Sequence, residues 1–288
     1  MTDIRNPSLS VVIRTKNEEK HIGEVLARLG EQVYEGRTEV VLVDSGSSDE
    51  TVTVADRFGC RIIHMKPREF SFGRALNRGI MQAAGEIIIF LSGHSVPAGK
   101  DYFSKMVKPF ADPEMAATFG RDIPWPDACP SQARDILNHF PDSDLEGSKF
   151  SNANAAVRRK IWEQVPFDEQ LTACEDLLWA QKVMGLGYRI TYVPGASVYH
   201  SHTASPYYIF RRYLRERSSV RKILDLPGLA IKDILKNSFW HIKCDFRFVR
   251  ERSYGFRWYF HIPLYRLSQE IGLYIGSRRA EQGRGSVG

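Results

Sequence analysis

The stretch EVVLVDSGSSDET, residues 39–51, predicts a buried strand, a tight turn and the start of a helix. The apolar run at 40–43 is typical of a buried strand, and the serines and glycine at 45–48 are typical of a turn. Ser47 and Glu50 have the spacing of a capping box, which marks a helix N-terminus. The stretch therefore forms a βα unit, the building block of a parallel sheet.

The same alternation of strand and helix fills the first third of the chain. Further strands are predicted at LSVVIRT (9–15), CRIIHM (60–65) and EIIIFLS (86–92), and a further helix at GRALNRGIMQAA (73–84). Between the first two strands, apolar residues at helical spacing predict one buried helix face, formed by Ile22, Val25, Leu26, Leu29 and Val33. We therefore expect the α/β class, with a doubly wound, mostly parallel central sheet flanked by helices.

Beyond residue 100 the pattern is less regular. Prolines punctuate IPWPDACP (123–130), and residues 149–165 predict a strand that leads into a short helix. A helix that starts with two acids is predicted over 174–187, and a strand and loop follow at 188–202. One face of that helix is expected to consist of Leu177, Ala180 and Met184.

The charge of the chain is unevenly distributed. The 288 residues carry a formal net charge of +6, but residues 211–288 contain 17 Lys and Arg against 7 Asp and Glu. This asymmetry indicates an anionic partner of the C-terminal part, either a membrane surface or nucleic acid. No apolar run approaches the roughly 20 residues of a membrane span, and we see no leader peptide, so we expect a location inside the cell. The four cysteines lack the spacing of a zinc site and are expected to be reduced.

Polar residues follow three of the predicted strands. Ligands of an open parallel sheet bind outside the carboxyl ends of its strands, so side chains in these positions are candidates for a site. They are Thr15 to Glu18, Asp44 to Asp49, and Ser92 to Ser95. We expect all three groups to face one crevice.

Asp44 ends an apolar strand, where a carboxylate is costly to bury unless a polar group pairs with it. A base N–H or a ribose hydroxyl of a nucleoside would satisfy this carboxylate. The alternative is that Asp44 only caps the turn and the next helix. The turn could also bind a phosphate at the N-terminus of the next helix. Asp49 and Glu50 at that helix start would repel a phosphate, so nucleoside recognition is favoured.

Glu175 and Asp176 begin a predicted helix after a loop. A carboxylate in a crevice can act as a general base if it reaches a substrate hydroxyl. The alternative is that the two adjacent acids only complement the helix dipole.

His200 and His202 follow a predicted strand, so in an extended segment both imidazoles point to one side. Such a pair can bind a metal or a phosphate. A third histidine lies in IIIFLSGHSVP (87–97), where the loop after the strand offers Ser92, Gly93 and His94 but no acid.

In this order the motifs resemble the family 2 nucleotide-sugar glycosyltransferases, inverting enzymes of the GT-A fold, over roughly residues 8–215. SVVIRTKNEE resembles the family's nucleotide-binding turn, with Arg14 and Lys16 in place of its usual Pro and Tyr. VVLVDSGSSDET resembles its base-recognising segment, and residues 167–202 resemble the region from its catalytic acids to its C-terminal histidine. The most similar branch contains many rhamnosyltransferases and other surface-polysaccharide enzymes.

The resemblance implies transfer, with inversion, from a UDP- or dTDP-sugar to a hydroxyl of a glycan or polyprenyl-diphosphate-linked acceptor. Asp176 would be the general base, and Glu175 would steady it or bind the acceptor. The Asp44 carboxylate would accept from the pyrimidine N3–H. The implied donor contacts are Thr15, Glu18, Asp44, Arg74, Asn77 and Ser92, and the implied acceptor contacts are Asn152, Asn154 and Arg212.

The family normally has Asp-x-Asp where this chain has Ser92, Gly93 and His94, and the last carboxylate of that motif holds a divalent cation. His94 with His200 could bind a metal instead, and imidazole ligands favour Mn²⁺ over Mg²⁺. The alternative is metal-independent action, in which a protonated His94, helped by Arg74 or the basic C-terminal segment, stabilises the leaving diphosphate.

We expect residues 1–210 to form the GT-A catalytic domain and 211–288 to form a basic, aromatic-rich, mainly helical region with a flexible tail. Interleaved basic and aromatic residues suit a peripheral position at the anionic inner face of the cell membrane. The alternative is a helical appendage that packs on the core or on a second subunit of a homodimer. Nucleic-acid binding is not expected, given the N-terminal motifs. For the whole chain, the rival hypothesis is a catalytically silent scaffold that binds nucleotide-sugar or glycan.

Overall fold

The computed structural model describes residues 6–143, 150–202 and 204–282, so most of the predicted C-terminal tail lies outside the described residues. The chain divides into two compact units. The sheet unit comprises Met1–Ile123, Phe140–Leu171 and Glu175–His200, and the helical unit comprises Pro124–His139, Thr172–Cys174 and Ser201–Gly288.

The sheet unit is built on an eight-stranded sheet with the order β3-β2-β1-β4-β7-β6-β8-β5. β1 to β4 pair in parallel, whereas β7 is antiparallel to both β4 and β6. β8 pairs in parallel with β6 and antiparallel with β5. The strands are β1 (Leu9–Thr15), β2 (Thr38–Asp44), β3 (Arg61–His64), β4 (Ile87–Ser92), β5 (Val96–Pro97), β6 (Met115–Ile123), β7 (Asn154–Arg158) and β8 (Arg189–Tyr199). The predicted α/β class is confirmed, with a mixed rather than purely parallel sheet.

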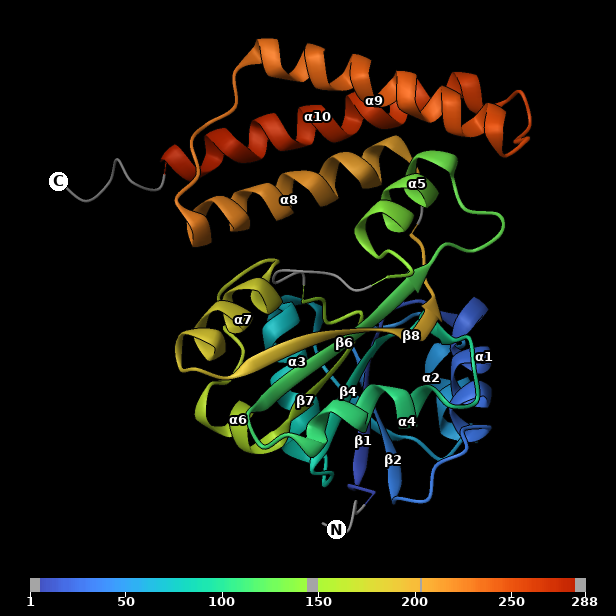
Figure 1. Cartoon of the computed structure of the whole chain (residues 1–288), viewed down its shortest axis with the longest axis vertical. Helices are drawn as coiled ribbons and strands as arrows, with labels where there is room; N and C mark the ends of the chain where they lie inside the picture. Colours follow the sequence, from blue (N-terminus) through green and yellow to red (C-terminus); the bar gives the residue numbers. More distant parts are fainter. Residues whose placement is uncertain (1–5, 144–149, 203, 283–288) are drawn as a thin grey trace, which may run out of the picture. The chain divides into compact units, whose positions relative to one another are not determined.

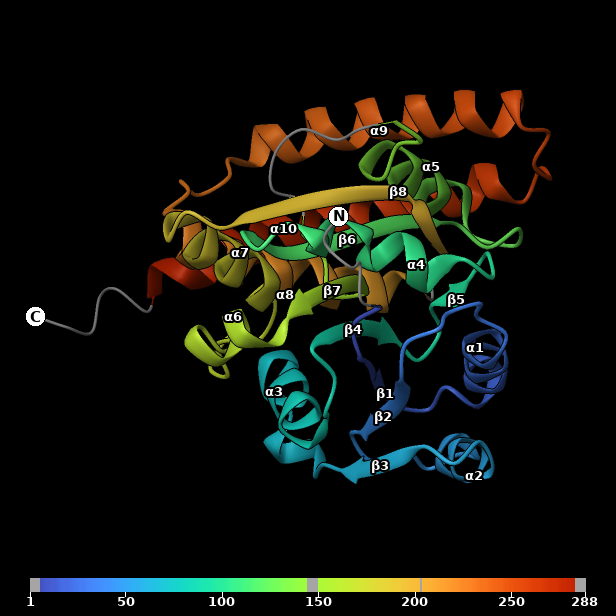
Figure 2. The ribbon, with the colours of Figure 1, turned by 60° about the horizontal axis from the view of Figure 1, so that its bottom comes forward.

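Helices cover both faces of this sheet, which explains the continuous apolar sequences of its inner strands. Val11, Val12 and Ile13 of β1 are completely buried. Figures 1 and 2 show α1, α2 and α4 on one face and α3, α6 and α7 on the other. These helices are α1 (Glu19–Gly30), α2 (Thr51–Arg57), α3 (Phe72–Gln82), α4 (Tyr102–Val107), α6 (Arg159–Gln164) and α7 (Glu175–Gly185), with short 3-10 helices at Pro67–Glu69 and Lys108–Ala111.

Two predicted helix faces differ from the structure. Val33 is 70% exposed because α1 ends at Gly30, before the apolar periodicity does. Met184 is exposed because α7 turns a different face towards the sheet. The buried face of α7 consists of Trp179, Ala180 and Val183.

The predicted capping box at the start of α2 is also wrong. α2 begins at Thr51, and neither Ser47 nor Glu50 caps it with a side chain. The Ser47 hydroxyl instead donates to the Asp44 carboxylate at 2.5 Å, which holds it within the turn. The Asp49 carboxylate accepts from the Thr51 N–H at 3.1 Å and so satisfies one of the first donors of the helix.

The helical unit contains α5 (Pro130–His139), α8 (Pro206–Leu224), α9 (Ile231–Glu251) and α10 (Trp258–Gln282), which confirms the mainly helical C-terminal region. The start of α8 follows from its sequence, because Pro206 stands in the first turn and the Ser205 hydroxyl accepts from the Tyr208 N–H at 3.3 Å. In this unit α10 runs alongside α8 and α9 (Figure 1).

Two glycines allow α8 and α10 to approach closely. A Cβ atom at Gly272 would lie 2.6 Å from the carbonyl oxygen of Phe210, and one at Gly276 would lie 2.5 Å from that of Leu214. Any side chain at either position would push the two helices apart. The spacing of four residues places both glycines on the same face of α10.

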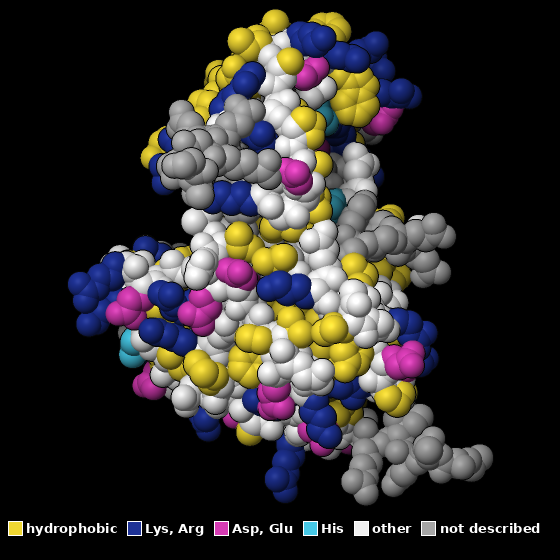
Figure 3. All heavy atoms as spheres, turned by 90° about the vertical axis from the view of Figure 1, so that its left-hand side faces the viewer, with side chains coloured by type: hydrophobic (Ala, Val, Ile, Leu, Met, Phe, Trp, Pro, Cys, Tyr) yellow, Lys and Arg dark blue, Asp and Glu magenta, His cyan; other side chains and the backbone are white. Residues whose placement is uncertain are grey.

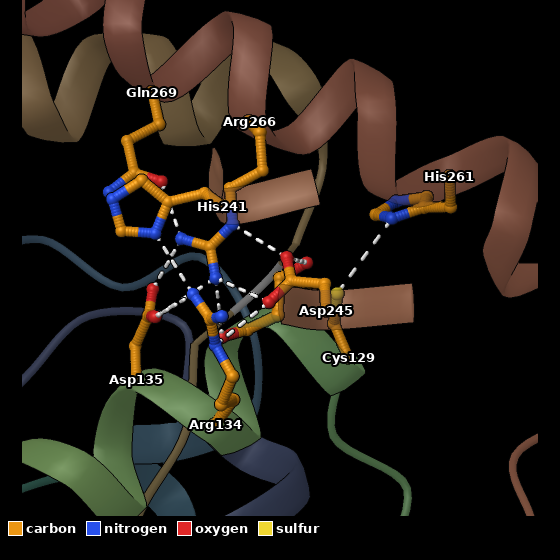
Figure 4. A network of polar contacts seen from close by, with 9 residues as sticks. Cys129, Arg134, Asp135, His241, Asp245, His261, Arg266 and Gln269 are labelled. Atoms are coloured by element: carbon orange, nitrogen blue, oxygen red, sulfur yellow. Dashed lines mark hydrogen bonds and ion pairs between the residues drawn. The ribbon is translucent and has the colours of Figure 1, made fainter. Parts of the chain in front are cut away.

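Four charged side chains form a buried network among α5, α9 and α10 (Figure 4). Arg266 is completely buried, and its guanidinium contacts the Asp245 carboxylate at 2.6 Å and the Asp135 carboxylate at 2.7 Å. Arg134 contacts Asp245 at 2.9 Å. Two cations therefore face two anions, so the network is neutral and fixes the three helices to one another.

The compact units divide the chain after His200, whereas a border at residues 210–211 would fall inside α8. The predicted division into two domains stays a prediction, since compactness does not test whether either part folds alone. Among the described residues, no helix combines the length and the apolar character that a membrane span requires.

Candidate active site

The loops that follow β1, β2 and β4 meet at one edge of the sheet, as predicted. The Ser45 N–H donates to the Thr15 carbonyl at 3.0 Å, and the Gly93 N–H donates to the Arg14 carbonyl at 2.9 Å. The first two loops are also joined through Asn17, whose side-chain oxygen accepts from the Ser48 N–H at 2.8 Å. Asn17 has φ = 55°, a strained left-handed conformation that such cross-loop contacts can maintain.

Asp44 is buried at the end of β2, and its carboxylate is engaged within its own turn. It accepts from the Gly46 N–H at 3.1 Å and from the N–H and hydroxyl of Ser47 at 3.2 and 2.5 Å. His64 lies 3.8 Å away. Asp44 therefore caps its own turn through these hydrogen bonds, and a contact with a nucleoside would be in addition to them.

The two acids at the start of α7 differ in exposure. Glu175 is buried, whereas Asp176 is partly exposed. The Asp176 carboxylate accepts from the Leu177 N–H at 2.8 Å and from the Asn152 N–H at 3.3 Å, so its position is fixed by backbone groups. Asp176 is therefore the more exposed member of the pair.

Arg14, at the end of β1, is the buried cation beside these acids. Its guanidinium lies 3.7 Å from the Glu175 carboxylate, donates to the Asn152 carbonyl at 3.3 Å and stacks over the Phe72 ring at 5.1 Å. Burial and the charge of Asp176 raise the pKa of Glu175 to about 7, and Arg14 opposes this shift. Burial also raises the pKa of Asp176. One cation thus faces two carboxylates that share one low-dielectric site.

Two imidazoles lie together at the same edge. The His94 and His200 rings are stacked with their centroids 4.9 Å apart. The Nδ1 atom of His94 lies 2.7 Å from the Glu18 carboxylate, and that of His200 lies 2.7 Å from the Asp122 carboxylate. Each carboxylate thus holds its imidazole through Nδ1, an arrangement that orients a histidine which binds a metal through its other ring nitrogen.

The chemistry of this pair fits a divalent transition metal. His94 and His200 each offer a ring nitrogen within 4.8 Å of the other. Burial, together with neighbouring His200, lowers the pKa of His94, with Glu18 opposing this effect. A neutral imidazole is a metal ligand, whereas an imidazolium is not.

Gly93 is required for the contact between Glu18 and His94. A Cβ atom at Gly93 would lie 2.8 Å from the Thr15 hydroxyl and 2.9 Å from the Glu18 Cγ atom. The loop after β4 can therefore pack against the loop after β1 only without a side chain at this position. In consequence, one oxygen of the Glu18 carboxylate is held by His94, and the predicted donor contact of Glu18 stays a prediction.

The residues predicted to line the diphosphate are engaged with the segment before α7. Arg74 contacts the Glu169 carboxylate at 2.8 Å. The Asn77 amide donates to the Phe167 carbonyl and to Glu169, and its oxygen accepts from Trp162 and the Phe167 N–H. All the hydrogen-bonding groups of Asn77 are thereby occupied, so the structure gives this side chain a packing role.

Of the predicted acceptor residues in the sheet unit, Asn152 lies beside the acids and Asn154 does not. Its amide lies 3.4 Å from the Glu175 carboxylate. Asn154 is buried inside the sheet, where it donates to the Ala196 carbonyl and accepts from the Tyr102 hydroxyl. Arg212 belongs to the helical unit and pairs with Glu216 at 2.7 Å, so its acceptor contact stays a prediction. Ser92 is partly exposed at the end of β4.

Sequence reasoning assigned no role in the site to Arg14 or Asp122. Arg14 could have been noticed as a charged residue near the end of an apolar strand, where burial requires a counter-ion. Asp122 stands near the end of β6, so the rule that identified Asp44 would have identified it had that strand been predicted.

Comparisons with known proteins identify the family of the chain. A family model described as Glycosyl transferase family 2 matches residues 10–146. The O-antigen chain rhamnosyltransferase RfbN of Salmonella typhimurium is 31% identical over 221 residues, which cover 71% of this chain and 70% of RfbN. The O-antigen chain rhamnosyltransferase WbaN of Salmonella anatum is 30% identical over 190 residues, covering 61% of this chain and 60% of WbaN.

Among solved structures, the mannosyltransferase PcManGT from Pyrobaculum calidifontis, in complex with GDP-Man and Mn²⁺, has a TM-score of 0.66 at 20% identity. The match covers 98% of this chain and 89% of PcManGT. The sheet and its flanking helices thus define a protein of the GT-A fold. The chain belongs to glycosyl transferase family 2, and it is a glycosyltransferase.

Proposed function

We propose that this enzyme transfers a sugar, with inversion, from a UDP- or dTDP-sugar to a hydroxyl of a glycan or polyprenyl-diphosphate-linked acceptor during surface polysaccharide assembly. The observation that carries the proposal is the partly exposed Asp176 beside the buried Glu175, at the edge where the loops after β1, β2 and β4 meet. The similarity to two O-antigen chain rhamnosyltransferases favours a deoxyhexose as the transferred sugar.

Asp176 acts as the general base in this proposal. Its carboxylate removes the proton of the acceptor hydroxyl, and the oxygen attacks the anomeric carbon of the donor. The bond from that carbon to the diphosphate oxygen breaks on the opposite face, so the nucleoside diphosphate leaves and the anomeric configuration inverts. Glu175 is buried and steadies the base, and Asn152 orients both acids through its backbone N–H and its amide.

The donor binds at the loops after β1, β2 and β4. Asp44 is held by the turn after β2, where one carboxylate oxygen can also accept from a pyrimidine N3–H, since a carboxylate has about four acceptor positions. Thr15 and Ser92 stand at the ends of the two neighbouring strands and complete the donor site.

His94 and His200 hold a divalent metal, for which imidazole ligands favour Mn²⁺ over Mg²⁺. When bound, the metal neutralises the charge of the departing diphosphate. Glu18 and Asp122 keep the two imidazoles in a fixed orientation through Nδ1. The lowered pKa of His94 makes the metal-independent alternative, with a protonated His94, less favourable.

The helical unit brings the enzyme to the inner face of the cell membrane as a peripheral protein. Two observations support this position. Residues 211–288 contain 17 Lys and Arg but 7 Asp and Glu, and many aromatic side chains of this unit are exposed. Anionic lipids attract such a surface, and aromatic rings favour the interfacial region.

A donor screen tests the proposed activity. Thermal shifts with UDP, dTDP, GDP and CMP, followed by transfer assays with the corresponding sugars, should show stabilisation by a pyrimidine diphosphate and turnover with its sugar. Stabilisation by GDP alone would overturn the role of Asp44. The missing acid in the Ser92-Gly93-His94 loop favours the rival, a silent scaffold, and pyrimidine nucleotide binding without turnover on any donor would support that rival.

A further inference from the structure

The surface of the helical unit contains a hollow of about 550 Å³ between α9 and the start of α10. Cationic and aromatic side chains line it, and none of the carboxylates that the structure describes does. The lining residues are Trp240, Lys243, Cys244, Phe246, Arg247, Arg250 and Tyr259. None of them has been given a role in glycosyl transfer.

The three cations of the hollow stand on one face of α9. Lys243, Arg247 and Arg250 are spaced by four and three residues, which places their side chains side by side. Arg247 pairs with Glu251 at 2.8 Å, whereas none of the described acids forms an ion pair with Lys243 or Arg250. Like charges at this spacing repel one another, so an anion between them would relieve the repulsion.

A row of aromatic rings in contact with one another extends from the hollow to exposed side chains. The Tyr259 ring, which lines the hollow, contacts the Phe246 ring with their centroids 4.9 Å apart. It also contacts the ring of Phe256, outside the hollow, at a centroid distance of 5.7 Å. The centroids of Phe256 and Phe260 are in turn 5.5 Å apart. Phe256 is 74% exposed and Phe260 is 68% exposed. Figure 3 shows hydrophobic and basic side chains interspersed on this unit.

We infer that the hollow binds the phosphate group of an anionic phospholipid, while Phe256 and Phe260 insert between neighbouring lipids. The inference rests on the proposed peripheral membrane position and adds a defined headgroup site to it. Cations beside exposed aromatic rings match the phosphate and acyl boundary of a bilayer. A second copy of the chain is a poorer occupant, because it would place the same cations against one another.

Vesicle co-sedimentation tests the inference with two double variants of equal charge. Lys243→Gln with Arg250→Gln removes two cations from the hollow, and Lys232→Gln with Lys236→Gln removes two exposed cations from α9 outside it. All four side chains are exposed, so both variants should fold. Each cation lost near an anionic surface weakens binding about fivefold.

The vesicles contain phosphatidylcholine and phosphatidic acid. On them, the affinity of the variant with two cations removed from the hollow should be about tenfold or more lower than that of the control variant. Phe256→Ser with Phe260→Ser should also release the protein, and inorganic phosphate should not. Equal losses in the two charge variants would overturn the headgroup site while leaving peripheral binding intact. Release by inorganic phosphate would indicate a free-anion site instead.

Failure of wild-type protein to bind these vesicles would overturn the membrane proposal itself, and the headgroup site with it. Sugar transfer to a water-soluble acceptor is measured separately, so neither result decides the catalytic proposal. If the wild-type protein forms dimers without vesicles and the variant with both Phe256→Ser and Phe260→Ser does not, the surface binds a second copy of the chain. That result would overturn the inference.

Discussion

The Arg14 guanidinium lies 3.7 Å from the Glu175 carboxylate, and their side chains are only 12% and 4% exposed. This cation stands where the resemblance places a proline, so the chain has a largely buried charge beside the proposed catalytic acids. Burial raises the pKa of both Glu175 and Asp176, and the charge of Arg14 opposes this shift in each acid.

Arg14→Met should move the acid limb of the pH profile of kcat to higher pH. The base must be ionised, so activity falls as the pH drops through the range in which the coupled acids Glu175 and Asp176 take up a proton. The pKa of Glu175 in this pair is about 7. Loss of a neighbouring cation raises a carboxyl pKa by about 1 to 3 units, which should lower kcat at neutral pH about tenfold or more.

Arg14→Lys is the matched control, because it keeps the charge and should keep most of the profile. An acid limb that stays in place in Arg14→Met would show that Arg14 acts only through packing on Phe72.

Asp176→Asn should lower kcat by about 10²- to 10⁴-fold, because general-base catalysis is lost while the shape of the side chain is kept. Donor affinity, measured by titration with the nucleotide diphosphate, should stay nearly unchanged. Glu175→Gln should reduce kcat less, since this side chain is buried behind the base. Substantial turnover in Asp176→Asn would remove Asp176 from the role of base.

The first βα units could be predicted because their strands are buried on both faces and bounded by polar turns. The predicted strands at 9–15 and 86–92 agree closely with β1 and β4. β6, with the sequence MAATFGRDI, has no long apolar run, yet most of its residues are buried, and it lies between β7 and β8 in the sheet. A pattern within one segment cannot report such long-range pairing.

The candidate site was predictable to a similar extent. Thr15, Asp44 and Ser92 could be placed together because parallel strands end at the same edge of a sheet. The pairing of Asp122 with His200 joins residues 78 positions apart and depends on how β6 and β8 align. Likewise, spacing alone could not reveal that the Asn77 amide is fully occupied by its neighbours.

Asp122→Asn should weaken Mn²⁺ binding about 10- to 100-fold, because a carboxylate that holds the other nitrogen of a histidine ligand orients it and raises its basicity. Direct titration of Mn²⁺ measures this effect without any substrate. Asp101→Asn, at an exposed carboxylate immediately before α4, is the control. If chelator leaves the activity of wild-type protein intact, the metal site at His94 and His200 is wrong.

Arg266→Met should destabilise the helical unit by about 3 to 5 kcal/mol, because it leaves the carboxylates of Asp245 and Asp135 in the network with one fewer cation. Urea unfolding followed by tryptophan fluorescence measures the change. Arg247→Met is the matched control, since this exposed arginine pairs with Glu251 on the same helix and should give no measurable change. Equal midpoints for the two variants would mean that apolar packing, and not the buried ion network, fixes α5, α9 and α10 to one another.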